Sequence, residues 1–87
     1  MSVPEISRFY GIIIQMFFKD HHPPHFHITY GEYRAVITIE NAIVEGNMTS
    51  KALKLVFEWM ELHKDELMEN WELTQKGELP KAIEPLK

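Results

Sequence analysis

A two-residue turn between two alternating segments is the feature that most constrains this sequence. Residues 25–30 and 33–40 are rich in aromatic and β-branched types, and only Gly31 and Glu32 separate them. Such runs favour strands, and a two-residue connection that begins with glycine favours a type II′ hairpin. We therefore predict an antiparallel hairpin over residues 25–40.

The short turn also fixes the register of this hairpin, because side chains alternate between the two faces of a strand. One predicted face is apolar and contains the cross-strand pairs Phe26 with Ile37, Ile28 with Ala35, and Tyr30 with Tyr33. The opposite face contains the pairs His25 with Thr38, His27 with Val36, and Thr29 with Arg34. The apolar face is expected to lie on the core, which places both histidines on the other face.

Two further segments complete the predicted sheet. Residues 6–18 are predicted to form one strand, since the even positions from Tyr10 to Phe18 are all apolar. After a turn at Asn41 and Ala42, residues 43–46 are predicted to form a short edge strand. The first half of the chain is thus expected to be an antiparallel meander of about four strands.

A long amphipathic helix is predicted after the sheet. Thr49 or Ser50 is a suitable N-cap, and Gly77 and Pro80 end the helical pattern. Apolar residues recur at the spacing of one helical face, at Leu53, Val56, Phe57, Met60, Leu67 and Trp71. We predict one C-terminal helix over residues 50–76 that packs on one face of the sheet, which makes the fold α+β.

The length of this helix poses a packing problem. A straight helix would be about 39 Å long, whereas an eight-residue strand is roughly 25 Å long. Two solutions are open: a break near residues 63–65, or an end that overhangs the sheet and leaves Leu67 and Trp71 in need of cover. That cover would come from Ile83 and Leu86 in the tail, or from a second copy of the chain.

Composition bounds the class of protein. Residues 1–87 are predicted to be one domain, with sheet over 1–47, helix over 50–76 and an extended tail over 77–87. No apolar run approaches the roughly 20 residues that cross a bilayer. The net charge of −4 disfavours an avid, nonspecific nucleic-acid binder. Cysteine is absent and the N-terminus lacks the pattern of a secretory signal, so we expect a cytoplasmic location.

A histidine cluster is the only chemically suggestive feature of the sequence. Four of the five histidines lie within residues 21–27, directly after Asp20. His25 and His27 are two apart on the predicted strand, so their rings project from one face with Cα atoms about 6.6 Å apart. This spacing suits two ligands of one divalent metal such as zinc, or a paired general acid and base. The loop offers His21, His22 or Asp20 as further ligands.

The same histidines also have an ordinary structural interpretation. His25 and His27 would then belong to a solvated polar strand face and bond to neighbours such as Thr38. His63 lies along the buried stripe of the predicted helix. A lone histidine there is usually a packed residue, bonded to a backbone carbonyl or a tyrosine.

Three segments carry a resemblance to a known family. They are Pro4-Glu5-Ile6, Pro23-Pro24-His25-Phe26-His27-Ile28, and residues 61–71 with Glu61-Leu62-His63 and Glu69-Asn70-Trp71. On these segments the chain resembles the bacterial family called domain of unknown function 4160. The resemblance implies a pattern of Pro23, Pro24, His25, His27, His63 and Trp71, and hence a three-histidine zinc site with an open fourth position. The register argument opposes this grouping, because it places His63 and the histidine pair on different faces.

The resemblance implies no established activity, although members of this family look like toxin–antitoxin components encoded beside a second small protein. One hypothesis is a ribonuclease-like toxin, with His25 and His27 as general base and acid and Arg34 stabilising phosphate charge. A second is a non-catalytic binding module, either an antitoxin or the partner of a regulator. A third is a small metal-binding protein with His25, His27, His21 and His63 as candidate ligands. The expected partners are the neighbouring-gene protein, RNA or a second copy of the chain. We expect no association with a membrane.

Overall fold

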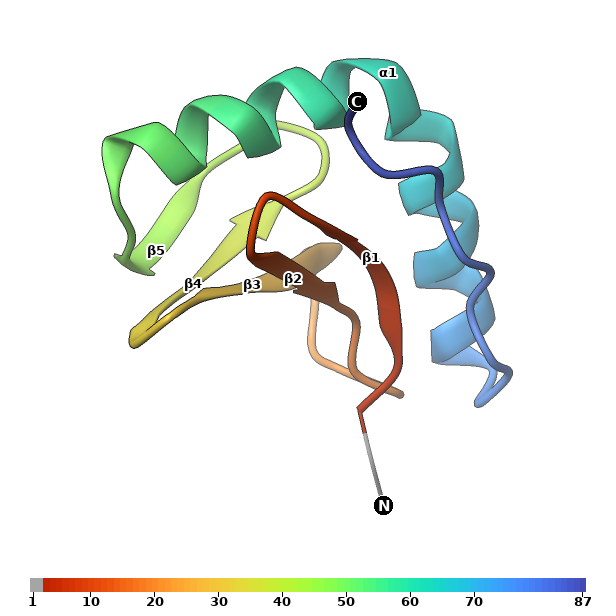
Figure 1. Cartoon of the computed structure of the whole chain (residues 1–87). Coiled ribbons are helices and arrows are strands. Elements are labelled where there is room, and N and C mark those ends of the chain that lie inside the picture. Colours follow the sequence, from red (N-terminus) through yellow and green to blue (C-terminus); the bar gives the residue numbers. More distant parts are fainter. Residues whose placement is uncertain (1–2) are drawn as a thin grey trace.

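The computed structural model describes residues 3–87 and forms an antiparallel sheet followed by one long helix (Figure 1). The elements are β1 (Glu5–Phe9), β2 (Ile12–Gln15), β3 (His25–Tyr30), β4 (Tyr33–Thr38), β5 (Val44–Asn47) and α1 (Ser50–Gln75). The strand order in the sheet is β1-β2-β3-β4-β5, so each strand pairs with its neighbours in the chain. The predicted α+β meander is confirmed, with five strands in place of about four.

The additional strand arises within residues 6–18, where a single strand is the wrong prediction. Tyr10 and Gly11 form a turn between β1 and β2, with φ angles of 50° and 81°. Two successive residues with positive φ fit a type I′ hairpin turn. The side chain of Tyr10 is consequently 59% exposed, whereas Ile12 and Ile14 lie in the core as predicted.

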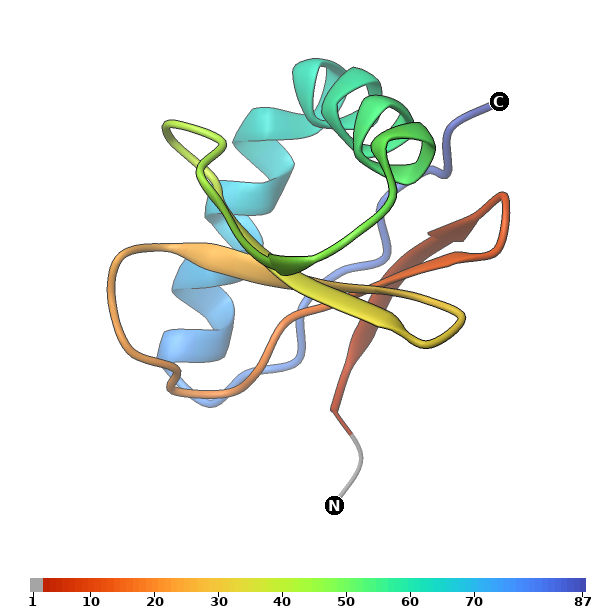
Figure 2. The ribbon, with the colours of Figure 1, turned by 90° about the vertical axis from the view of Figure 1, so that its left-hand side faces the viewer.

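The central hairpin has the predicted register in full. Phe26 pairs with Ile37, Ile28 with Ala35, His27 with Val36, and His25 with Thr38. Phe26, Ile28 and Ile37 are fully buried on the inner face of the sheet, the face turned toward α1. Figure 2 shows α1 over this face, while the opposite face is left uncovered.

The helix begins where the sequence predicts and bends where its length requires. The Thr49 hydroxyl caps the first turn by accepting a hydrogen bond from the Ala52 amide at 3.1 Å. His63 has non-helical angles (φ −131°, ψ 23°), so of the two alternatives left open by the sequence the structure shows the break near residues 63–65. The first half of α1 crosses the inner face of the sheet, and the second half turns down past one end of it (Figure 1).

The tail after α1 runs back along the second half of the helix (Figure 1). The amide of Asn70 exchanges hydrogen bonds with the backbone of Lys81, each at 2.8 Å. The Ile83 amide donates to the carbonyl of Ile6 in β1, and Ile83 is buried in the same cluster as Leu67 and Trp71. The tail thus supplies the cover that the far end of the helix needs.

Within residues 3–87, α1 lacks a stretch apolar enough and long enough to cross a membrane.

Candidate functional site

The histidine-rich loop between β2 and β3 is attached to the far end of α1. The Lys19 amide donates to the carbonyl of Thr74 at 3.1 Å. The side chain of Gln75 donates to the carbonyl of Asp20 at 3.0 Å. The loop also contains a cis peptide bond between His22 and Pro23. The bend in α1 is what brings the helix end within reach of this loop.

One carboxylate of the loop joins the two strand histidines. Oδ2 of Asp20 lies 2.8 Å from Nε2 of His25 and 3.1 Å from Nε2 of His27. We call these three residues the Asp–His centre. The exposed fractions of the side chains are 3% for His25, 15% for Asp20 and 25% for His27. The centre is therefore closed on the His25 side and opens to solvent past His27.

The burial of His25 results from the bent helix. His25 is the first residue of β3 and alternates with inner-face Phe26, so it belongs to the outer face of the sheet, the face turned away from α1. Its ring nevertheless packs against Trp71, with centroids 5.3 Å apart. Because the second half of α1 runs past the end of the strand, Trp71 can cover a residue that the register places opposite the helix.

The hydrogen bonds of His25 determine which ring nitrogen holds a proton. Nδ1 lies 2.7 Å from the carbonyl oxygen of Pro23, which can only accept, so Nδ1 carries a hydrogen. Nε2 lies within hydrogen-bond distance of Oδ2 of Asp20, so both ring nitrogens of His25 have a polar partner.

The carboxylate of Asp20 is held in its ionised form. Burial by itself raises the pKa of this carboxyl, but hydrogen bonds from His27, the His21 amide and His25 outweigh burial and hold the pKa below its usual value. Asp20 is thus an anion at neutral pH, with Oδ2 turned toward the two rings and Oδ1 bonded to the His21 amide at 2.9 Å.

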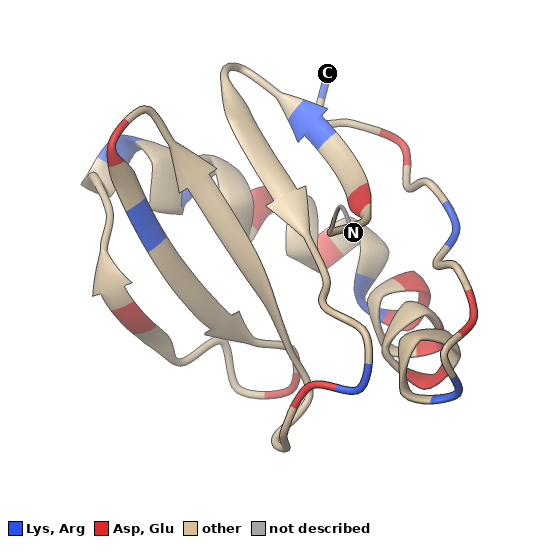
Figure 3. Cartoon of the chain, turned by 90° about the horizontal axis from the view of Figure 1, so that it is seen from below, with Lys and Arg blue, Asp and Glu red and all other residues tan. Residues whose placement is uncertain are grey.

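The third member of the centre faces the outer surface. The ring of His27 is stacked on Phe17, with centroids 3.9 Å apart and planes 19° apart. His27 and Arg34 both line an open concavity on the outer face of the sheet. Figure 3 shows the strands from this side. Arg34 lies opposite Thr29 in the register and is therefore a diagonal neighbour of His27 on the adjacent strand. Residues in this relation have Cα atoms about 7–8 Å apart. Arg34 is exposed, whereas Arg8 on this face is ion-paired with Glu5.

The remaining histidines lie at the rim of the centre or apart from it. His21 is exposed, and its ring centroid lies 5.2 Å from that of His25. His22 packs edge-on against Trp71. His63 lies at the bend of α1, where Nδ1 is 2.6 Å from a carboxylate oxygen of Glu66 and the ring packs beside Trp59. The structure brings together His25 and His27, and it leaves His63 with other partners.

From the sequence, Asp20 is predicted only as one of three possible further metal ligands from the loop. Its side chain joins the centre because the loop is fixed by Thr74 and Gln75, which are more than fifty residues away in the chain. The available signal was its place as the nearest acidic residue before the histidine run.

The fold and the site define a small α+β protein with an acid-linked histidine pair at an open sheet face. Residues 11–72 match the model of the family described as domain of unknown function (DUF4160), and the chain belongs to this family. The match includes all three residues of the Asp–His centre. No curated protein and no solved structure matches the chain.

Proposed function

We propose that this chain is the toxin half of a toxin–antitoxin pair and that it cleaves phosphodiester bonds of RNA at the Asp–His centre. The observation that carries the proposal is the joint position of His27 and Arg34 on the open outer face, with Asp20 bound behind His27. Imidazoles and carboxylates can serve as general acids and bases in phosphodiester cleavage, and a guanidinium can stabilise the charge of the transition state.

Each of these groups has a distinct role in the proposal. His27, whose edge is exposed, takes the proton of the ribose 2′-hydroxyl, and the 2′-oxygen attacks phosphorus. The bond from phosphorus to the 5′-oxygen breaks, and the leaving 5′-oxygen takes a proton from the protonated His27 or from solvent water. Arg34 stabilises the negative charge that develops on the phosphate. His25 is a positioning residue, because its burial keeps it from touching a substrate and its bonds to Asp20 and Pro23 hold the carboxylate in place.

The net charge of −4 limits the kind of RNA binding that supports this function. Broad phosphate contacts over the surface need many cations, so recognition must be local to the outer face. Phe17 lies beside His27 and is partly exposed, which gives a base a surface on which to stack.

Two assays test the proposal. In the first assay, untagged protein is incubated with single-stranded RNA, with and without added zinc or manganese. In the second, expression of the protein is induced in a bacterial host and growth is followed. Wild type is expected to cleave RNA and arrest growth, and His27→Gln and Arg34→Ala are expected to lose both effects while remaining folded. His21→Ala is the matched control, because it removes an exposed histidine of the same loop. Intact RNA under all conditions, with normal growth, would refute the proposal.

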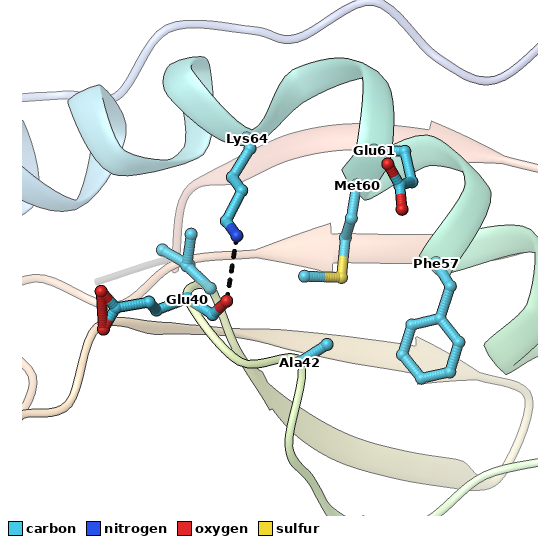
Figure 4. Close-up of a pocket in the computed structure, with 7 residues that line it drawn as sticks. Glu40, Ala42, Phe57, Met60, Glu61 and Lys64 are labelled. Atoms are coloured by element: carbon cyan, nitrogen blue, oxygen red, sulfur yellow. Dashed lines mark hydrogen bonds between the residues drawn. The ribbon is translucent and has the colours of Figure 1, made fainter.

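A second candidate function is a non-catalytic binding module, and a different surface supports it. An apolar pocket lies between the β4–β5 connection and α1 (Figure 4). It is lined by Ile39, Glu40, Ala42, Phe57, Met60, Glu61 and Lys64. The nearby side chain of Ile43 is exposed, and β5 is the last strand of the sheet among residues 3–87. An antitoxin or a regulator could dock there by strand addition.

The two candidates predict opposite variant effects in a co-purification with the neighbouring-gene protein. A binding module loses its partner on Ile43→Asp and keeps it on His27→Gln. A toxin whose antitoxin covers the Asp–His centre loses its partner on His27→Gln and keeps it on Ile43→Asp.

A further inference from the structure

We propose that the Asp–His centre is a binding site for one divalent transition-metal ion of the zinc class. The ligands are Oδ2 of Asp20, Nε2 of His25 and Nε2 of His27, with a fourth position open toward the outer face. The inference goes beyond the function proposed above, because ion binding can be measured without RNA and does not depend on the reaction.

The first argument is the convergence of the three ligand atoms. They all lie within 4.8 Å of one another, and Oδ2 of Asp20 is 2.8 Å and 3.1 Å from the two nitrogens. Tetrahedral zinc with bonds of about 2.0–2.1 Å separates its ligands by about 3.4 Å. The two oxygen–nitrogen distances therefore need to lengthen by about 0.3–0.6 Å to reach this separation, and the two nitrogens already lie within 4.8 Å of each other.

The second argument is the orientation of the His25 ring. Nδ1 lies 2.7 Å from the Pro23 carbonyl oxygen, so Nε2 is the nitrogen that faces Oδ2 of Asp20. A backbone carbonyl on the far nitrogen is the usual way in which a metal-bound histidine is oriented.

The third argument is that each ligand is held by a second group. Oδ1 of Asp20 accepts from the His21 amide, His25 is bound by Pro23, and the ring of His27 is stacked on Phe17. Gln75 also ties the backbone of Asp20 to α1. A ligand set held in this way loses little conformational freedom when an ion binds.

The donor types indicate the class of ion. Two imidazole nitrogens and one carboxylate oxygen suit zinc, cobalt, nickel, iron or manganese. Calcium and magnesium prefer sites built entirely from oxygen. His27 is 25% exposed, so the fourth position is open to solvent on its side, where a water bound to the ion would have a pKa of about 7.

The test is a calorimetric titration of chelator-stripped, untagged protein with zinc, alongside cobalt absorption and native mass spectrometry. One ion per chain, a raised Tm with zinc but not with calcium or magnesium, and a cobalt spectrum typical of four ligands are expected. Asp20→Asn and His27→Gln should each weaken binding at least tenfold, while His21→Ala and His63→Gln should bind as wild type does.

Wild-type binding no tighter than that of Asp20→Asn would overturn the inference. Loss of binding in His21→Ala or His63→Gln would overturn the ligand set. Zinc binding without RNA cleavage would refute the proposed function alone.

Discussion

The ring of His25 and the carboxylate of Asp20 face each other across 2.8 Å, although the other nitrogen of that ring already donates to Pro23. The pair lies at the start of β3, where the bent second half of α1 covers it with Trp71. The ring of His25 is therefore buried with a polar partner on each of its two nitrogens, which fixes its orientation in the centre.

Loss of the Asp20 charge should destabilise the fold. Asp20→Asn puts an amide opposite the two imidazoles, and a buried charge-assisted hydrogen-bond network is disrupted. We expect the free energy of unfolding in urea to fall by about 1–3 kcal/mol. Asp65→Asn on the exposed side of α1 is the control and should change it by less than about 0.5 kcal/mol. Equal effects of the two substitutions would contradict the account of the centre.

The hydrogen bond between Gln75 of α1 and the backbone of Asp20 should stabilise the loop that contains Asp20. Gln75→Ala removes the bond to the Asp20 carbonyl and should cost about 0.5–1.5 kcal/mol of stability. Amide hydrogen exchange in residues 19–24 should also become faster, because the loop loses one of its anchors. Glu72→Ala, on the exposed side of the same helix end, provides the comparison. Unchanged exchange in the loop would show that Gln75 does not hold it.

The tail should detach when Asn70 is truncated. Asn70 is fully buried, and both ends of its amide bond to Lys81. Asn70→Ala should cost about 1–3 kcal/mol and remove the exchange protection of the Ile83 amide. Glu69→Gln breaks only the exposed ion pair with Lys81 and should have little effect on either quantity. If Ile83 stays protected in Asn70→Ala, its bond to Ile6 alone holds the tail.

Gly46 in β5 should be the least replaceable glycine of the sheet. It has a φ of 115°, and an added Cβ would lie 2.6 Å from the carbonyl oxygen of Arg34. Gly46→Ala should therefore destabilise by about 1–3 kcal/mol or more. Gly31 also has positive φ but open space around it, so Gly31→Asn should be tolerated far better. Similar midpoints of thermal unfolding for the two variants would contradict the packing of β5 on β4.

Local sequence rules were sufficient for the central hairpin and the helix. The turn at Gly31 and Glu32 fixes the register because its length leaves no alternative, and the pairing of Phe26 with Ile37 follows. Comparing the length of the helix with that of a strand gives a break near residues 63–65 as one of two alternatives, and the structure has the break at His63. These features depend on residues that are close together in the chain.

The turn between β1 and β2 and the composition of the site needed more than local rules. Apolar alternation continues through Tyr10 and Gly11, so a single strand fits the pattern as well as two do. The pairing of Asp20 with His25 depends on the bend of α1 and on contacts with residues near position 75. Spacing predicts that His25 and His27 share a face, but it cannot predict which distant element buries one of them.

The most direct test of the Asp–His centre is X-ray absorption spectroscopy at the zinc edge on the protein loaded with one equivalent of zinc. The account predicts four ligands at about 2.0–2.1 Å with the scattering pattern of two imidazoles, and one imidazole fewer in His27→Gln. A shell of oxygen ligands alone, or a spectrum that His27→Gln leaves unchanged, would show that Asp20, His25 and His27 do not act together as one site.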